Sequence, residues 1–397
     1  MTQPPALSPS SGDQQNPGGF THVPALDGIR GLAILLVLGT HLFWANPHTD
    51  SRFFNFLSDL FASGYIGVNL FFALSGFLIT GILIDTLHIP RFFKTFYARR
   101  VLRIFPLYFG FLLLLLLLTR PLHFVWNGWQ YYYLTYTANL VLWHNKELIL
   151  PHFNINHFWS LQVEEQFYLV WPFLVYRVRH CRSIFRISIA VCFVILLIRV
   201  VLVIFRGHFS NIYLPYSPTF SCADNLLYGC GLCALLRTAS RERVLQLAPR
   251  VFGICISILA VVVFIYHGLQ WQNNFFVPTF GFSIVGIGAA ALIAMTLRPR
   301  SLTQMLFKNR VLRFFGKYSY GLYVYHYSID QALTVPLRHV IDNHFHSKAL
   351  GVLLTAMVVF VLSILIALLS FHFFESRFLR LKRYFSYNRS AQPLSVK

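Results

Sequence analysis

The sequence predicts an all-α, polytopic integral membrane protein with about ten transmembrane helices and both termini in the cytoplasm. Three observations support this fold class. Of the 397 residues, 56% are hydrophobic and only 12% are charged, which is about half the charged fraction of an average globular chain. The apolar residues are grouped in long runs, and the basic residues lie mainly in alternate connections between those runs. This composition excludes a soluble globular domain.

The same composition excludes several other classes of protein. A net charge of +20 does not indicate nucleic-acid binding here, because the 41 Phe, 20 Tyr and 7 Trp lie in apolar runs and leave no solvated basic face. Six cysteines in 397 residues are too few for a disulfide scaffold. The chain also lacks HExxH, P-loop, GxGxxG and GxSxG motifs. We therefore expect neither a metal site nor a permanently bound cofactor.

The two ends of the chain differ in composition from the region between them. Residues 1–23 are rich in Pro, Ser, Gly and Gln and are expected to form a disordered tail. They contain no basic segment followed by an apolar one, so we expect no cleaved signal peptide, and the first apolar run itself should direct insertion. Residues 24–376 are expected to form the membrane domain, and residues 377–397 a basic cytoplasmic tail.

Ten apolar segments approach the roughly 20 residues that a helix needs to cross a bilayer. A further Tyr-rich segment, 131–143, is too short to cross. Because aromatic side chains favour the headgroup region, we expect this segment to be an interfacial or re-entrant piece on the outer side, although its placement stays open. The ten expected spans are residues 28–46, 65–86, 104–119, 158–178, 187–205, 221–236, 251–268, 278–297, 318–336 and 349–374.

Lysine and arginine predict the orientation of these segments, because cytoplasmic loops carry an excess of them. With the N-terminus inside, four inner loops and the C-terminal tail hold 25 of the 33 Lys and Arg, whereas the outer segments hold six. Counting 131–143 as a crossing would invert every later loop. The asymmetry therefore predicts that both termini are cytoplasmic.

The first span carries two ionisable residues, Arg30 and His41, at positions where charged side chains cost at least about 2.5–3.5 kcal/mol to insert. They are eleven residues apart, so both project from one helix face, about 16 Å apart along the axis. We expect Arg30 near the inner surface and His41 near the outer end. Taken alone, the pair also fits a snorkelling arginine and a histidine bonded to a neighbouring helix.

The segment 156–175, NHFWSLQVEEQFYLVWPFLV, carries two adjacent carboxylates in an otherwise apolar, aromatic helix. If the helix runs inward, Glu164 lies about 9 Å below the outer edge, at the depth expected for His41. A histidine beside a carboxylate in a low-dielectric site is typical of a general base. We therefore expect Glu164 to support His41. The two glutamates diverge by about 100°, so one should face the interior and the other contact the backbone or His157, and both are candidate catalytic residues. Which glutamate faces the site stays open, as does a purely structural polar cluster.

Other polar residues fall at similar levels within the expected spans. Asn69, Asp224 and Asp330 lie near outer ends, and His326 lies nearer the membrane centre. Each alone commonly makes a helix–helix hydrogen bond. Together they predict a polar cavity open to the outer side, with Asn69, Trp159, Asp224 and His326 as candidate substrate-binding residues.

On the inner side, the segment FYARRVLRIFPLY at 96–108 concentrates Arg99, Arg100 and Arg103 at the mouth of the third span. Guanidinium groups recognise phosphates through two parallel hydrogen bonds. The cluster therefore predicts a phosphate-binding fork, with ordinary anchoring at the cytoplasmic surface as the alternative.

These motifs resemble the acyltransferase-3 family of integral membrane O-acyltransferases over about residues 26–383. LDGIRGLAILLVLGTHLF is similar to the family's first-helix signature, with its Arg-x10-His at Arg30 and His41. FFALSGFLIT, YARRVLRIFPLY with its RxxR-like Arg100 and Arg103, HFWSLQVEEQFYLVWP and YSYGLYVYH then follow in the family's order. Five motifs in one order make the resemblance specific.

The chain departs from the family's pattern in two respects. The usual Arg-x-Asp ahead of the sixth helix reads Cys222-Ala223-Asp224, so a contact made by that arginine is in doubt. Few residues follow the last expected span, so we expect no C-terminal SGNH hydrolase-like domain in this sequence.

The resemblance implies transfer of an acyl group, usually acetyl, from cytoplasmic acyl-CoA to a hydroxyl of a cell-surface glycan, lipid-linked sugar or other acceptor. It implies a multi-pass location in the plasma (bacterial inner) membrane. It also implies that Arg100 and Arg103, and by extension Arg99, lie near the CoA phosphates. Arg30 would serve donor binding or site integrity, and His41 would carry the chemistry.

The sequence leaves several alternatives open. A transporter or flippase of a lipid-linked sugar would use the same polar cavity without acyl transfer, although the chain shows no internal repeat of the kind common in transporters. A catalytically silent scaffold is a third interpretation. If the protein is an acyltransferase, direct transfer and an acyl-histidine intermediate are both compatible with the sequence. Acceptor identity, acyl chain length and oligomeric state stay undetermined.

Overall fold

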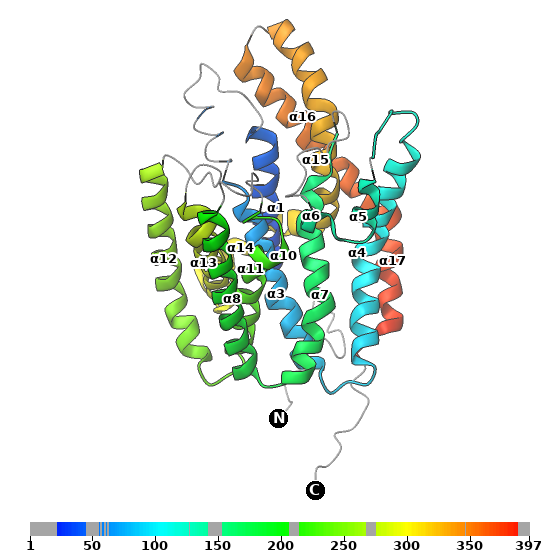
Figure 1. The fold of residues 1–397 in the computed structure, drawn as a ribbon. Coiled ribbons are helices and arrows are strands. Elements are labelled where there is room, and N and C mark those ends of the chain that lie inside the picture. Colours follow the sequence, from blue (N-terminus) through cyan, green and yellow to red (C-terminus); the bar gives the residue numbers. More distant parts are fainter. Residues whose placement is uncertain are drawn as a thin grey trace, which may run out of the picture.

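The computed structural model describes residues 22–44, 55, 58, 61, 63–126, 128–141, 153–205, 214–266, 275–345 and 347–387, and over these ranges the chain is helical with no β-strand. The long helices stand roughly parallel, and α15 and α16 extend beyond the others at one end (Figure 1). The long helices are α1 (Pro24–Trp44), α3 (Ile66–Thr86), α4 (Phe92–Leu117), α7 (Trp159–Val178), α8 (Cys181–Ile204), α11 (Asp224–Leu235), α12 (Arg241–Tyr266), α13 (Phe282–Leu297), α15 (Arg310–Phe345) and α16 (Lys348–Ser370).

Within the described part of the chain, seven helical segments are long and apolar enough to cross a membrane. The chain is therefore a multi-pass membrane protein. The other three expected spans are also helical, but each lacks either the length or the apolar composition of a membrane-crossing helix. The helix α7 contains two glutamates, α11 has only 12 residues, and α15 is a 36-residue helix with many polar residues. Length and apolar composition thus support seven spans of the roughly ten that we expected.

The Tyr-rich segment forms two short helices, α5 (Trp129–Leu134) and α6 (Ala138–Val141), neither of which is long enough to cross. The segment packs into the bundle, because the backbone N–H of Asn139 donates to the side-chain oxygen of Gln162 on α7 at 2.6 Å. Residues 142 and 143 of this segment, and the expected disordered tail up to residue 21, lie outside the described residues.

Glycines allow close contact between the central helices. The helix α1 packs against α3 and α15, and α3 packs against α11. A Cβ at Gly229 would lie 1.9 Å from the carbonyl oxygen of Ala73, and a Cβ at Gly76 would lie 1.9 Å from that of Leu226. The LSGFL sequence around Gly76 therefore serves helix packing, as small residues commonly do in membranes.

We expect Gly229→Ala to destabilise the protein, because α3 and α11 would have to separate. Overpacking costs about 1–3 kcal/mol, and this exceeds the gain of up to about 1 kcal/mol from the better helix propensity of alanine. Thermal unfolding of the purified variants measures the effect. Gly253→Ala on α12 is the matched control, since a Cβ there would meet no atom within 4 Å. Equal unfolding temperatures for the two variants would contradict the close-packing account.

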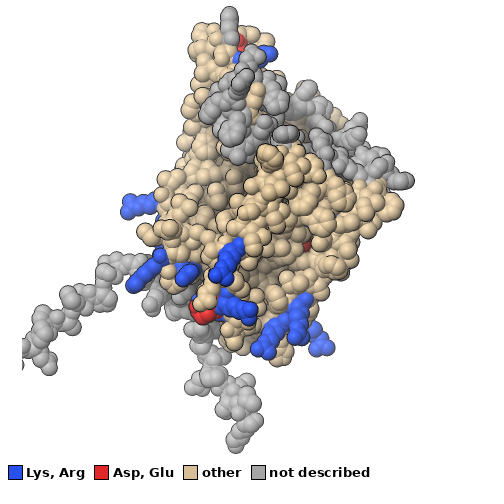
Figure 2. Space-filling model, turned by 90° about the vertical axis from the view of Figure 1, so that its left-hand side faces the viewer, with Lys and Arg blue, Asp and Glu red and all other residues tan. Residues whose placement is uncertain are grey.

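The two ends of the described chain lie at the same end of the bundle, because His22 and Tyr387 line one cavity. Basic side chains gather at this end, next to a broad surface that carries few charges (Figure 2). Residues from the start of the chain line this cavity together with basic residues such as Arg103, Arg237 and Lys382. The positive-inside pattern places the segments of these basic residues on one side of the membrane. The relative placement of these segments thus follows the charge pattern.

Candidate active site

A large cationic cavity, which we call the vestibule, opens at the end of the bundle where the described chain begins and ends. Its volume is about 740 Å³. Guanidinium and ammonium groups on its walls outnumber carboxylates, so it is suited to a polyanionic ligand. The basic and acidic side chains that line it are His22, Asp27, Arg30, Arg99, Arg100, Arg103, Arg237, Arg241 and Lys382.

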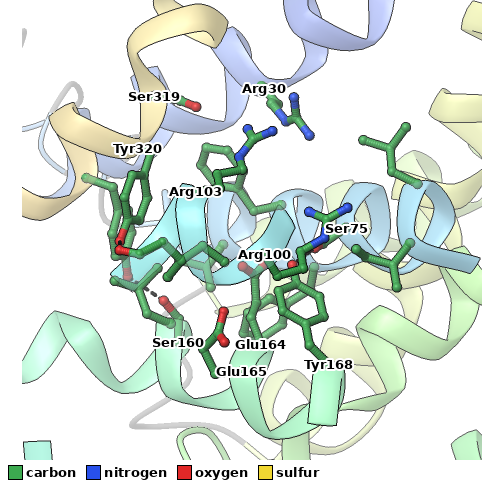
Figure 3. Close-up of a pocket in the computed structure, with 18 residues that line it drawn as sticks. Arg30, Ser75, Arg100, Arg103, Ser160, Glu164, Glu165, Tyr168, Ser319 and Tyr320 are labelled. Atoms are coloured by element: carbon green, nitrogen blue, oxygen red, sulfur yellow. Dashed lines mark hydrogen bonds between the residues drawn. The ribbon is translucent and has the colours of Figure 1, made fainter. Parts of the chain in front are cut away.

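A second cavity of about 100 Å³, which we call the inner chamber, continues from the vestibule into the bundle. The two cavities share Arg30, Arg100 and Arg103, and the side chains of these three arginines approach one another at the boundary (Figure 3). Beyond the arginines, apolar side chains line the chamber together with hydroxyl and carboxyl groups, including those of Glu164 and Tyr323. A ligand could therefore place an anionic group among the arginines and extend a narrower part into the bundle.

The four arginines predicted to bind a donor do not have equal environments. Arg99 donates hydrogen bonds to the backbone carbonyls of Lys382 (3.2 Å) and Phe385 (3.0 Å), and its guanidinium lies 5.3 Å from the ring centre of Tyr387. The expected basic tail is thus, up to residue 387, a docked segment that forms part of the vestibule wall. Arg99 holds this wall in place, whereas Arg100 and Arg103 point into the cavities.

The two glutamates of α7 lie in the inner chamber. Glu164 faces Ser75 and Tyr168, which are hydrogen-bonded to each other, and lies below Arg100 (Figure 3). Glu165 lines the same chamber, and its buried Oε1 has no hydrogen-bond partner within the described part of the chain. Both glutamates therefore face the cationic cavity system.

His41 lies at the opposite end of α1 from Arg30. Its Nδ1 lies 3.0 Å from the carbonyl oxygen of Val37 and 3.2 Å from Nε2 of His326. Its ring also contacts the ring of Tyr327, with centroids 4.5 Å apart. His326 is only 1% exposed and also contacts the ring of His157, with centroids 5.4 Å apart.

The expected pairing of His41 with Glu164 is wrong. His41 contacts Val37, His326 and Tyr327, and no hydrogen bond or ion pair among the described residues joins it to Glu164. The depth estimate put both residues near the outer end, but α7 turns its glutamates toward the arginines instead. Tyr323 is the link between the two regions, because it lines the chamber and its ring lies 5.7 Å from that of His326.

Asp224 is not available to a substrate, contrary to the sequence prediction. Both of its carboxylate oxygens accept hydrogen bonds from Arg199 at 2.8 Å, and both side chains are fully buried. Ser283 adds a hydrogen bond to the same carboxylate at 2.9 Å. The arginine thus comes from α8 rather than from position 222. Both charges were visible within the expected spans, and opposite charges inside a membrane commonly pair.

The other candidate substrate-binding residues are dispersed. Trp159 packs its ring between Phe72 and Tyr216, with centroids 6.0 and 4.6 Å away. Asn69 is 2% exposed, and its Nδ2 has no hydrogen-bond partner within the described ranges. Neither residue lines the vestibule or the inner chamber.

Arg237, Arg241 and Lys382 also line the vestibule, although none of them was among the predicted binding residues. Each had been assigned only to an inner loop or tail, and loop arginines that line a cavity look the same in sequence as loop arginines that anchor a helix. No group of three His, Cys, Asp or Glu in the described part of the chain has an arrangement that could hold a metal ion.

Comparison with known proteins places these features in a family. A family model described as an acyltransferase domain matches residues 23–372. The putative peptidoglycan O-acetyltransferase YrhL of Bacillus subtilis is 29% identical over 381 residues, covering 89% of this chain and 54% of the relative. The peptidoglycan O-acetyltransferase OatA of Listeria monocytogenes is 28% identical over 385 residues, covering 89% and 55%. The chain spans about half the length of the curated relatives it matches. No solved structure matches it.

Proposed function

Because the chain belongs to the acyltransferase-3 family, we propose that it is a membrane O-acyltransferase that moves an acetyl group from cytoplasmic acetyl-CoA to a glycan hydroxyl. The acceptor class is suggested by the relatives, two of which are named peptidoglycan O-acetyltransferases. The observation that carries the proposal is that the cationic vestibule shares three arginines with a chamber whose wall residue Tyr323 contacts His326, the neighbour of His41.

In this proposal the vestibule is the binding site for the acetyl-CoA donor. CoA carries several phosphate oxygens, and charge-assisted hydrogen bonds from arginine to phosphate are among the strongest in proteins. Arg100 and Arg103 would bind these groups, with Arg30 at the start of the chamber. The thioester arm would then extend through the chamber past Glu164. Arg30 and His41 are eleven residues apart on α1, or about 16 Å along its axis, which is the distance the arm has to cover.

His41 supplies the chemistry in this proposal. Its imidazole takes the proton from the acceptor hydroxyl while the hydroxyl oxygen attacks the thioester carbonyl. The carbon–sulfur bond breaks, CoA leaves as a thiolate, and the proton returns from the imidazole to that sulfur. No net oxidation or reduction takes place. An acyl-histidine intermediate is the alternative, and labelled protein trapped without acceptor would reveal it.

The decisive assay uses purified full-length protein, radiolabelled acetyl-CoA and soluble peptidoglycan fragments. We expect acceptor-dependent release of CoA and labelled acetate on the glycan. Movement of a lipid-linked sugar across vesicles without CoA release would instead identify a transporter, and would overturn the proposal.

We expect Arg100→Gln and Arg103→Gln each to weaken acetyl-CoA binding. A hydrogen bond to a charged group contributes about 1.5–3 kcal/mol, so the loss should be on the order of 10- to 100-fold. Calorimetric titration with CoA at low and high salt measures it, and the wild-type affinity should fall more steeply with salt than that of the variants. Arg250→Gln is the matched control, because Arg250 is exposed and lies outside both cavities. Equal affinities for all four proteins would remove the arginines from the donor site.

A further inference from the structure

We propose that His326 is a positioning residue that holds His41 in the tautomer needed for proton abstraction. The inference rests on the proposed function and goes beyond it, since it replaces the carboxylate expected beside His41 with a second histidine. It follows from the hydrogen-bond partners of the two rings, which come from the neighbouring helices α1 and α15.

The first step concerns the proton on His326. Its Nδ1 lies 2.9 Å from the carbonyl oxygen of Leu322 and 2.9 Å from that of Tyr323. Carbonyl oxygens only accept hydrogen bonds, so Nδ1 of His326 must carry a proton. In a neutral imidazole the other nitrogen is then an acceptor. Nε2 of His326 therefore presents a lone pair to its neighbour.

The second step concerns the proton on His41. Its Nδ1 faces two acceptors, the carbonyl oxygen of Val37 at 3.0 Å and Nε2 of His326 at 3.2 Å. A proton on Nδ1 satisfies both, whereas a bare Nδ1 would set its lone pair against the carbonyl oxygen. Nδ1 is thus protonated, and the lone pair of His41 lies on Nε2, the nitrogen that can accept a proton from a hydroxyl.

A doubly protonated His326 does not fit this geometry. It would donate a hydrogen bond from its Nε2 to Nδ1 of His41, so Nδ1 of His41 could not carry a proton. The carbonyl oxygen of Val37 would then face a lone pair at 3.0 Å. His326 is also 1% exposed, and a charge there would lack water. The neutral pair is therefore the arrangement consistent with these four contacts.

This arrangement has the same logic as other catalytic pairs in which a third group orients the base. When His41 takes a proton on Nε2, its Nδ1–H remains directed at the lone pair of His326, which stabilises the imidazolium that forms. The acceptor is a neutral nitrogen rather than a carboxylate, so no second charge is buried beside the donor thioester.

Two substitutions of similar volume separate the acceptor from the rest of the side chain. In His326→Gln the amide group reaches the position of Nε2, so its oxygen can accept from His41. In His326→Asn the amide overlies Nδ1, so it keeps the backbone hydrogen bond but leaves Nε2 without a substitute. We expect Gln to retain kcat within about 10-fold and Asn to lose on the order of 10²-fold, with KM for acetyl-CoA unchanged in both.

A double-mutant test distinguishes positioning from general stability. Residues that act as a unit are strongly non-additive, so His41→Ala/His326→Asn should be no less active than His41→Ala alone. Gel filtration and CoA binding check that each variant is folded. If the wild type is active but His326→Asn and His326→Gln have equal kcat, the positioning role is overturned and the proposed function stands. A multiplicative loss of activity in the double variant leads to the same conclusion. A wild type that transfers no acetyl group overturns the proposed function and, with it, this role.

Discussion

Replacing His41 with alanine is expected to lower kcat for acetyl transfer by about 10²–10⁴-fold, the usual contribution of a positioned general base. Binding of acetyl-CoA should change little, because His41 lines neither the vestibule nor the inner chamber. Steady-state rates at saturating donor, together with calorimetric affinities for CoA, measure the two effects separately.

His372→Ala is the matched control for this experiment. His372 makes the same type of contact as His41, from Nδ1 to the carbonyl oxygen four residues earlier, at 2.8 Å, but it is exposed and lines neither cavity. It should retain wild-type kcat. Wild-type turnover by His41→Ala would remove this histidine from the chemistry, and loss of CoA binding would move it to the donor site instead.

Breaking the ion pair between Arg199 and Asp224 is expected to have the largest effect on stability. Removing one partner of a buried pair leaves an uncompensated charge and costs about 3–5 kcal/mol. Asp224→Asn should therefore unfold at a much lower temperature than the wild type. Five of the six cysteines are buried, so a thiol-reactive fluorophore reports the unfolding of detergent-purified protein.

Two further variants test the cause of this loss. Asp85→Asn breaks a pair with Arg237 of similar length, 2.9 Å, but the Asp85 side chain is 42% exposed. Exposed pairs contribute about 0–1 kcal/mol, so this control should unfold close to the wild type. Arg199→Met/Asp224→Leu removes both charges and should recover much of the stability. An Asp224→Asn variant as stable as Asp85→Asn would show that the buried pair does not stabilise the bundle.

The fold was predictable because the bilayer imposes strong constraints on sequence. Apolar length and the positions of Lys and Arg identified the helices, and the vestibule brings together basic residues from segments that the charge pattern had placed on one side. The count of spans was less certain, because α11 is short and α7 carries carboxylates. Apolar content alone does not identify a helix that is covered by its neighbours.

The individual residues of the site could be predicted, but the contacts between them could not. Arg30, His41 and Glu164 were singled out because charged or polar side chains are costly in a span. Their partners depend on which helices are adjacent and how each is rotated. The contact between His41 and His326 joins residues 285 positions apart, and the expected depths along the membrane normal favoured Glu164 over His326 as the neighbour.

The docking of the C-terminal segment on Arg99 has a consequence for biosynthesis. The side chains of Lys382 and Tyr387 complete a wall whose other members come earlier in the chain, from the residues in and beside α1 and α11 and from the helices α3, α4, α12, α13 and α14 (Leu302–Phe307). Ribosomes make those helices first, so every one of them can enter the bilayer before that wall exists. A nascent chain thus acquires its complete cationic vestibule only after residue 387 has been synthesised.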